Sequence, residues 1–582
     1  MKVFLNKNPR GLVRPLWGMA VVALMAAIGP VAAANGEFQF APSRTLSVEE
    51  AAQPRVAVDP QGRATVVWEA LGPEATALIQ VVRLNAFGLP GPVRTLDQFP
   101  KHAPQCPCPQ VAVDPYGRAT ITWQAYDGVR QTIKAVQMDA SEALGPTSTL
   151  SDATKDAWDQ QLAADPQGRV TIIWRYPSEG GVESVRLGLD GQPEDVNTLA
   201  EGNGAGLPDV AVGPEGRATA VWPTTEGLKT AQLDASGAPG PTQDVPSTGN
   251  SDGAVNVVVD SRGRATIAWW RGSGAYEAKS VRLDSAGVPG AVQNLSPPEQ
   301  DTYEPYLAVD PQDGVTAIWQ DFEDRVHAVR LDEDGIPEAV HTVSGDGRAG
   351  EPRVTSRPGG GAVVVWSHPA VIFIFPPKGE CLDLEFDPES DVVEAAFLGP
   401  DGQTEQISRV SSFGEQSLGA NVATDALSRP TVVWQSYDGT YFCDDWDTRV
   451  QASRGSEAPE VPPELGSKPP VPSEPPPSLS ESLLRLSNRA YVNGRHLVLS
   501  IRCSGGGGVS CAGEVKLLRR SHVFARGRYR LSVGRRTTIR LPLSKYGQAL
   551  ARRGSRGLVL TTGKGRRVET GVVWVRLPRR PH

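Results

Sequence analysis

Few residues in this chain have the types and spacing that catalysis requires. The densest acidic group is the run at 444–447, which surrounds Trp446, and glycoside cleavage would need such carboxylates to converge on one site. Residues 249–253 match the string G-x-S-x-G, but a strand follows them, whereas a nucleophile elbow requires a helix there. Residues 332–335 resemble the start of a calcium loop without its later ligands. We therefore assign no catalytic residue, metal ligand or cofactor.

A second pattern combines aromatic rings with acids. Tyr126-Asp127, Phe322-Glu323 and Tyr437-Asp438 each begin three residues after a repeated Trp. Such pairs suit sugars, because the C–H face of a sugar stacks on an aromatic ring while its hydroxyls bond to a carboxylate. The alternative is that these residues cap strand ends and pack between repeats. The predicted glycan-binding rim, near which Tyr303 also falls, comprises Tyr126, Asp127, Trp158, Phe322, Tyr437, Asp438, Tyr441 and Trp446.

Six cysteines raise the question of disulfide bonds, which an even number in an exported chain suggests. We predict a bond between Cys381 and Cys443, which lie in corresponding loops of consecutive repeats. Cys503 and Cys511 flank a Gly-rich turn and could bridge its hairpin. The Cys-Pro-Cys segment at 106–108 is poorly suited to a bond because the ring would be strained, and a metal site there would lack a second ligand pair.

A repeated unit must position all these residues. Residues 56–68 read VAVDPQGRATVVW, and seven further copies, two of them degenerate, place the final Trp 47 to 68 residues after the preceding one. Each copy is followed by a third apolar segment such as Val81–Leu84, a turn with Gly, and a short fourth segment such as Arg94–Leu96. Four strands in a unit of about 50 residues correspond to one propeller blade.

Eight copies predict an all-β fold, an eight-bladed β-propeller with four strands per blade. The Asp-Pro-x-Gly step between the first two strands has the residue preferences of a type I turn, so we interpret its Asp as structural, and the repeated Trp as core between blades. A surplus strand at 44–47 precedes the first unit, and the last unit lacks a fourth strand. We predict that the surplus N-terminal strand pairs with the third strand of the last unit, because this pairing removes two exposed sheet edges.

The irregular segments of the repeats gather in one set of loops. In a propeller, the loops between strands two and three lie on the same face as the blade-to-blade connections. Here these loops hold the Cys-Pro-Cys segment, the insertion at 367–391 and the segment 437–446, whereas the other turns are short and uniform. Binding residues usually occupy variable loops on a rigid scaffold, so we expect function on this face.

The repeat resembles those of secreted propellers loosely grouped with the sialidase (Asp-box) superfamily, over about residues 44–455. The Asp-box runs roughly S-x-D-x-G-x-T-W, whereas this chain has D-P-x-G-R-x-T-x-x-W between its first two strands. The resemblance implies a propeller shape and an extracellular setting. The short strands of the C-terminal region similarly resemble the immunoglobulin-like tails of secreted bacterial proteins.

The domain organisation follows from composition and charge. Residues 1–34 have a basic start, an apolar run and an A-x-A end, which predicts a cleaved signal peptide, with a retained membrane anchor as the alternative. We expect the propeller at 35–455, a Pro-rich linker at 456–480 and a basic β-sandwich at 481–582. From Glu481 onwards there are 23 Lys and Arg against 3 Asp and Glu, a net charge of +20; since the chain carries −8, residues 1–480 carry −28.

These features predict a secreted or cell-envelope-associated binding or scaffold protein, with a cationic tail that attaches to anionic surfaces. Expected partners are a polysaccharide or cell-wall polymer. Export disfavours nucleic acid as the natural partner, and no membrane span is expected after signal cleavage. The alternatives are a secreted carbohydrate-active enzyme of the sialidase type and a purely structural repeat protein. The ligand and the oligomeric state do not follow from the sequence.

Overall fold

The computed structural model describes most of the chain from Phe38 to Arg576. The exceptions are residues 101–105, 203–204, 247–253, 273–275, 299, 346–348, 369–391, 413–415, 439–446, 458–482, 494–495, 505–509, 520–521, 533–535, 546–557 and 563–571. Cys381, Cys443, Tyr441 and Trp446 fall in these exceptions, and so does the proposed signal peptide, which precedes Phe38.

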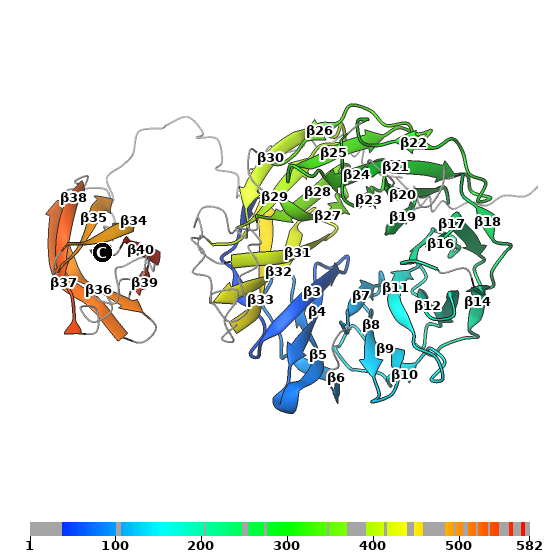
Figure 1. Ribbon diagram of the computed structural model, residues 1–582, viewed down its shortest axis with the longest axis horizontal. Helices are drawn as coiled ribbons and strands as arrows, with labels where there is room; N and C mark the ends of the chain where they lie inside the picture. Colours follow the sequence, from blue (N-terminus) through cyan, green and yellow to red (C-terminus); the bar gives the residue numbers. More distant parts are fainter. Residues whose placement is uncertain are drawn as a thin grey trace, which may run out of the picture.

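Eight antiparallel sheets of the expected four-stranded type form a ring, which Figure 1 shows along its axis. This confirms the predicted eight-bladed propeller. The innermost strands of neighbouring blades contact one another, and β31 of the last blade contacts β3 of the first. The strands are, from inside to outside, blade 1, β3 (Ala51–Val58), β4 (Ala64–Leu71), β5 (Thr76–Leu84), β6 (Arg94–Pro100); blade 2, β7 (Gln110–Val113), β8 (Ala119–Tyr126), β9 (Gln131–Met138), β10 (Ser148–Thr149); blade 3, β11 (Trp158–Ala164), β12 (Val170–Tyr176), β13 (Gly181–Leu187), β14 (Asn197–Ala200); blade 4, β15 (Asp209–Val212), β16 (Ala218–Thr224), β17 (Gly227–Leu233), β18 (Gln243–Asp244); blade 5, β19 (Val255–Val259), β20 (Ala265–Gly272), β21 (Tyr276–Leu283), β22 (Gln293–Asn294); blade 6, β23 (Tyr306–Val309), β24 (Val315–Gln320), β25 (Val326–Leu331), β26 (His341–Thr342); blade 7, β27 (Gly350–Ser356), β28 (Ala362–Ser367), β29 (Val393–Leu398), β30 (Thr404–Arg409); and blade 8, β31 (Gln416–Thr424), β32 (Pro430–Asp438), β33 (Asp447–Glu457) with β1 (Phe38–Phe40) and β2 (Arg44–Thr45).

The repeated Trp residues form the core between blades, as predicted. All eight are at most 1% exposed, and each belongs to an apolar cluster that joins its blade to a neighbour. In one such cluster Trp68 packs with Val433 and Val450 of blade 8. Because burial of a large aromatic side chain removes much apolar surface from water, this ring of Trp residues is a major source of stability.

The Asp-Pro turns also form as expected. In the first turn, the N–H of Gly62 donates to the carbonyl of Asp59 at 2.8 Å, and the N–H of Arg63 donates to Oδ1 of Asp59 at 2.8 Å. Gly62 adopts φ +81°, a left-handed conformation that glycine reaches without strain. Nε of Arg63 donates to the other carboxylate oxygen at 2.6 Å. The Asp side chain thus fastens its own turn and pairs with the Arg that follows it.

A second arginine, in the third strand, extends this pairing to the next blade. Arg454 of blade 8 ion-pairs with Asp425 of its own blade, and its Nη1 donates to the carbonyl of Gly62 in blade 1 at 2.7 Å. Arg186 of blade 3 donates in the same way to the carbonyl of Gly216 in blade 4, at 2.6 Å. We call this unit, the turn Asp with the third-strand Arg that reaches the next turn, the Asp–Arg clasp.

Three blades lack the clasp. Blade 2 keeps the turn Asp114 but has Gln137 in place of the third-strand Arg, whereas blades 4 and 7 lack both halves. Blade 4 has Gly213 in place of the turn Asp and Gln232 in place of the third-strand Arg. Blade 7 has Arg357 in place of the Asp and Phe397 in place of the Arg. A buried guanidinium without its carboxylate would be costly, which accounts for the loss of the arginine in both blades that lack the Asp. The reverse does not hold, because Asp114 of blade 2 still pairs with Arg118 of its own turn.

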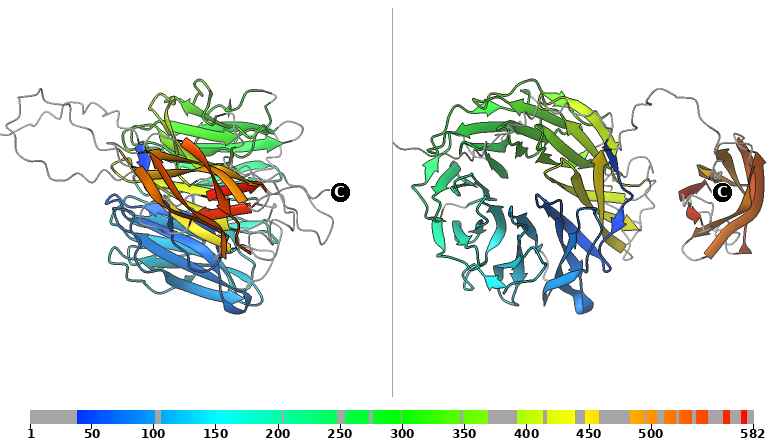
Figure 2. Two further views of the ribbon diagram at one scale, coloured as in Figure 1. Left: turned by 90° about the vertical axis from the view of Figure 1, so that its left-hand side faces the viewer. Right: turned by 180° about the vertical axis from the view of Figure 1, so that it is seen from behind.

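The N-terminal strands close the ring. β2 pairs with β33, with Arg44 opposite Ala452, which confirms the predicted pairing, and β1 extends it along the same strand. Figure 2 shows these blue strands beside blade 8. Phe38 of β1 stacks on Phe397, with ring centroids 4.2 Å apart, so the side chain that replaces the blade 7 clasp arginine packs against the closing strand.

The described residues of the C-terminal region are almost entirely β-strand. Its seven strands form one sheet in the order β37-β36-β39-β40-β34-β35-β38, with β34 and β40 parallel. The hairpin expected between Cys503 and Cys511 is wrong, because β35 pairs with β34 and β38, whereas β36 pairs with β37 and β39. Their side chains lie outside the described set. Within the described residues, no helix is long and apolar enough to cross a membrane. The bounds are β34 (Leu483–Asn493), β35 (His496–Ser504), β36 (Ser510–Arg519), β37 (His522–Ser532), β38 (Arg536–Pro542), β39 (Leu558–Thr562) and β40 (Val572–Arg576).

We predict that Asp425→Asn lowers the free energy of unfolding by about 3 kcal/mol, because it leaves Arg454 buried without a counter-charge at the closing joint. Denaturant unfolding followed by tryptophan fluorescence measures the loss. Asp401→Asn is the control, since Asp401 is an exposed turn residue that accepts one hydrogen bond from the N–H of Gln403. Equal stability of the two variants would show that the clasp does not stabilise the ring.

Candidate functional site

The ring has two different faces. The turn face carries the Asp-Pro turns and the turns between third and fourth strands, and the loop face carries the strand two–three loops and the blade-to-blade connections. On the turn face, a cavity of about 550 Å³ is lined by corresponding residues of all eight blades, among them Val58, Pro60, Val113 and Pro115. The turn Asp carboxylates are buried against arginines, so this cavity presents mainly apolar groups and backbone.

An exposed cluster of aromatic side chains lies on the loop face, between blades 5 and 6. Ring centroids are 5.0 Å apart for Trp270 and Tyr276, 5.4 Å for Tyr276 and Phe322, and 4.7 Å for Tyr303 and Phe322. Tyr276 is 36% exposed, and Tyr303 and Phe322 are each 48% exposed. We call these four residues the aromatic patch. So much aromatic surface at one place is unusual for a face that contacts water alone.

Hydrogen bonds from the backbone hold the patch in place. Oδ1 of Asp301 accepts the N–H of Tyr276 at 2.8 Å, and the carbonyl of Asp301 accepts the N–H of Phe322 at 3.0 Å. The hydroxyls of Tyr276 and Tyr303 make no hydrogen bond within the described part of the chain, so both are available to a ligand. The side chain of Glu323, 74% exposed, follows Phe322 directly.

The structure brings Phe322 and Tyr303, both noted from the sequence, into this patch, but Tyr126 and Asp127 lie elsewhere. The ring of Tyr126 packs on the core between blades 1 and 2, and its hydroxyl donates to the carbonyl of Gly128 at 2.8 Å. Asp127 accepts the N–H groups of Val129 and Arg130, and these hydrogen bonds lower the pKa of its carboxyl. Both residues therefore build the β8–β9 hairpin turn, as the alternative interpretation had it.

The remaining residues of the predicted rim do not join the patch in the described structure. Trp158 is half-buried at the start of β11, opposite Arg175. Tyr437 and Asp438 end β32, opposite Thr448 and Asp447, in blade 8. Trp270 and Tyr276 escaped the sequence analysis because they come from the two sides of a strand two–three loop, and a repeat offset does not connect them.

Around the axis, the loop face has a recurrent backbone distortion. Six residues before the start of the Asp-Pro turn, or of its counterpart, five blades carry a residue in the left-handed region: Gln53 (φ 54°), Cys108 (43°), Asp159 (57°), Glu351 (52°) and Gly419 (62°). Left-handed conformations cost non-glycine residues on the order of 1–3 kcal/mol each and persist where surrounding contacts enforce them. Such distortions re-aim neighbouring side chains, and they concentrate here where the innermost strands begin.

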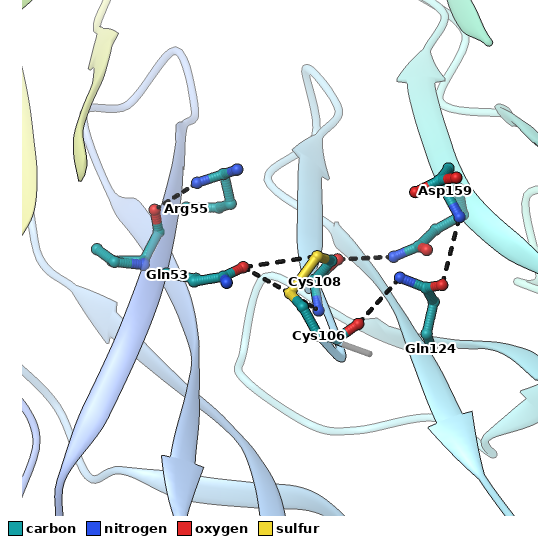
Figure 3. The surroundings of a disulfide bond; sticks show 8 residues. Gln53, Arg55, Cys106, Cys108, Gln124 and Asp159 are labelled. Atoms are coloured by element: carbon teal, nitrogen blue, oxygen red, sulfur yellow. Dashed lines mark hydrogen bonds between the residues drawn. A yellow bond between two sulfur atoms is a disulfide. The ribbon is translucent and has the colours of Figure 1, made fainter. Parts of the chain in front are cut away.

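One of these residues closes a disulfide. Contrary to the expectation from ring strain, Cys106 and Cys108 are bonded, with Cα atoms 5.1 Å apart. The left-handed turn at Cys108 brings the two sulfurs together. Figure 3 shows the surrounding contacts, in which Oε1 of Gln53 lies 2.7 Å from Sγ of Cys106 and Nε2 of Gln124 donates to the carbonyl of Cys106 at 3.1 Å. Nε2 of Gln160 donates to the carbonyl of Cys108 at 2.8 Å, which links blade 2 to blade 3.

Asp209 performs the joining role between blades 4 and 5, where the clasp is missing. Its Oδ2 accepts the N–H of Val257 at 2.8 Å and Nδ2 of Asn256 at 3.0 Å. Burial outweighs these hydrogen bonds and raises the pKa of Asp209 to about 7. The carboxyl therefore changes charge near neutral pH.

Comparisons with known proteins give no family. No protein-family model matches the chain, and no curated protein matches it, so the resemblance to the sialidase superfamily stays a prediction. Similar solved structures include the lectin BP39L from Burkholderia pseudomallei (12% identity, TM-score 0.43, 62% of this chain and 100% of that chain) and the polysaccharide lyase Uly1 (9%, 0.40, 69% and 89%). A protein of unknown function from Dyadobacter fermentans is also similar (11%, 0.36, 72% and 99%). Likenesses this weak extend neither to ligand nor to activity.

We predict that Asp209→Asn changes the pH dependence of stability. Because the folded pKa lies above the unfolded value, the wild-type protein loses stability as pH rises from about 4 to 7, and the variant is spared this loss. The free energy of unfolding of the variant relative to wild type should rise by about 2 kcal/mol across that pH range. This is less than the raised pKa alone implies, because solvent screens the charge of this half-buried carboxyl. Denaturant unfolding at several pH values measures it. A flat difference, like that expected for the exposed turn residue in Asp190→Asn, would contradict the prediction.

Proposed function

We propose that this protein is a secreted or cell-surface binding protein that recognises a glycan through the aromatic patch on its loop face. The carrying observation is the contact of Trp270, Tyr276, Tyr303 and Phe322 with three of the rings exposed. An aromatic face takes the apolar C–H side of a sugar ring, and an adjacent hydroxyl or carboxylate takes the sugar hydroxyls.

The scaffold supports such a role. The patch spans two blades whose joint includes a clasp, in which Arg282 ion-pairs with Asp260 at 2.7 Å and donates to the carbonyl of Asp332 in blade 6 at 3.0 Å. A rigid joint keeps rings from two blades at fixed spacing without a ligand. Preorganisation of this kind reduces the entropy lost on binding.

The C-terminal region would supply attachment. Its net charge of +20 is opposite in sign to the rest of the chain, and it follows a segment rich in Pro. We propose that it holds the protein to anionic polymers or surfaces of the cell envelope, while the propeller presents the aromatic patch. Electrostatic attachment of this kind needs no specific groove.

We predict that the triple variant Tyr276→Ala, Tyr303→Ala, Phe322→Ala loses at least tenfold in affinity for any glycan that the wild-type chain binds on a glycan array, with little change in unfolding temperature, because the three rings are exposed. Phe87→Ala is the matched control, since Phe87 is 82% exposed on a turn-face loop of blade 1. Unaltered glycan binding by the triple variant, or absence of any glycan ligand, would refute the proposal.

The attachment can be tested on the full-length chain by retention on an immobilised polyanion such as heparin. Retention should fall steeply between 50 and 500 mM salt (about two orders of magnitude in affinity), because counterion release and screening govern contacts between many charges. Retention that does not depend on salt, or no retention at low salt, would show that the basic region does not act through its charge.

A further inference from the structure

Two arginines occupy equivalent positions on the innermost strands of blades 7 and 1, near the ring axis on the loop-face side. Arg55 in β3 and Arg353 in β27 each stand four residues before the start of the strand one–two turn, and each follows a proline. The residues before these prolines, Gln53 and Glu351, are both left-handed, with φ of 54° and 52°. The same strained backbone therefore directs both guanidinium groups.

The distortion is a β-bulge in both strands. The pairing of β3 with β4 shifts between Ala52 and Arg55, and that of β27 with β28 shifts between Gly350 and Arg353. Each guanidinium turns back onto the carbonyl of its proline, with Nη1 donating at 3.2 Å for Arg55, as Figure 3 shows, and at 2.9 Å for Arg353. Bulges next to binding sites commonly serve to re-aim a side chain, and this one recurs with the same arginine.

Neither guanidinium has the partner that a buried charge normally requires. Both are half-buried, and within the described residues neither forms an ion pair, whereas the third-strand arginines of the clasps bind carboxylates directly. Burial, and next the like charge of Arg353, lower the pKa of Arg55 to about 10, against the opposing effect of Glu351. Burial also lowers the pKa of Arg353, against the opposing effects of Glu304 and Glu351. No carboxylate forms an ion pair with either guanidinium among the described residues, so both groups can still donate hydrogen bonds to a bound oxyanion.

The neighbouring groups hold Arg353 without forming an ion pair with it in the described residues. Its Cζ lies 4.2 Å from the ring centroid of Tyr306, so the guanidinium lies over an aromatic face. The hydroxyl of Tyr306 donates to Glu304. The charges of Glu304 and Glu351 favour the guanidinium of Arg353, but neither carboxylate forms an ion pair with it in the described part of the chain. A planar guanidinium fixed in this way still presents N–H groups, in the fork that suits an oxyanion.

We propose that Arg55 and Arg353 form a binding site for an oxyanion group, a carboxylate, sulfate or phosphate carried by a ligand that approaches the axis from the loop face. The site is separate from the aromatic patch on blades 5 and 6 and does not depend on the proposed function of that patch. A ligand that fills both would be an acidic glycan, and one that fills this site alone would be a small anion.

The test uses the full-length protein with Arg55→Gln, Arg353→Gln and the double variant. Arg217→Gln is the control, because Arg217 is 60% exposed in the turn of blade 4. Isothermal titration calorimetry at fixed ionic strength measures binding of sodium glucuronate, sodium sulfate and sodium phosphate, with glucose as the neutral probe. We expect at least one anion to bind wild type, a loss of at least tenfold in each single variant, no binding in the double variant, and no effect of Arg217→Gln.

The unfolding temperature separates a binding site from a structural one. The bound anion should raise the unfolding temperature of wild type but not that of the double variant. Without anion the double variant should unfold close to the wild-type temperature, because neither guanidinium forms an ion pair among the described residues. Binding of glucuronate alone would identify a sugar acid, and binding of all three anions would identify a general oxyanion site. No anion binding by wild type, equal binding by the double variant, or a double variant that unfolds well below wild type would each overturn the proposal.

Discussion

The ring depends on a buried carboxylate that binds two arginines, one of which reaches the next blade. Asp425 shows both interactions, with Arg429 in its own turn and with Arg454, which also binds the carbonyl of Gly62 in the first blade. Burial alone would raise the pKa of Asp425, yet the hydrogen bonds and charges of these arginines lower it. The carboxylate therefore stays ionised inside the ring, and the apolar packing of the Trp residues is built around it.

The exceptions show that the third-strand arginine depends on the turn Asp, although the Asp of blade 2 persists without that arginine. Blade 7 has neither half of the clasp. The residue opposite its third-strand Phe397 is Val363, whereas the other blades have a Thr at that position. The hydrogen-bonded Asp, Arg and Thr are thus replaced in blade 7 by apolar side chains. That apolar surface receives Phe38 of the closing strand. Blade 4 loses the clasp as well, and there Asp209 binds the next blade from the other face. Each substitution is compensated at the joint that it affects.

Much of the fold could be predicted because its signals are local and repeated. The Asp-Pro turn, the buried Trp and the missing fourth strand each lie within a single unit, so eight copies reinforced one interpretation. The clasp escaped prediction because its acceptor is a distant backbone carbonyl, 30 residues away for Arg186 and 392 for Arg454, and a carbonyl leaves no mark on side-chain identity. The candidate sites were not predicted for a similar reason. The aromatic patch combines residues of two blades. Gln53 and Glu351 adopt left-handed conformations although Gln and Glu are not residue types that favour them. Cys106 and Cys108 pair for the same reason, since a left-handed residue relieves the constraint that made the bond look unfavourable.

The clasp runs in one direction around the ring, from an arginine of one blade to the turn of the next, and this affects how blades can be added. Where a third-strand arginine bonds to a carbonyl of another blade, as Arg186 and Arg454 do, the carbonyl belongs to the next blade around the ring. A single unit of about 50 residues can therefore encode a donor for its successor and an acceptor for its predecessor. A tandem duplication of one unit would therefore insert a blade whose two borders already match. The clasp itself places no limit on the number of copies. The closing strands fix the number of blades, because β1 and β2 pair with β33 and so complete the blade that meets the first one.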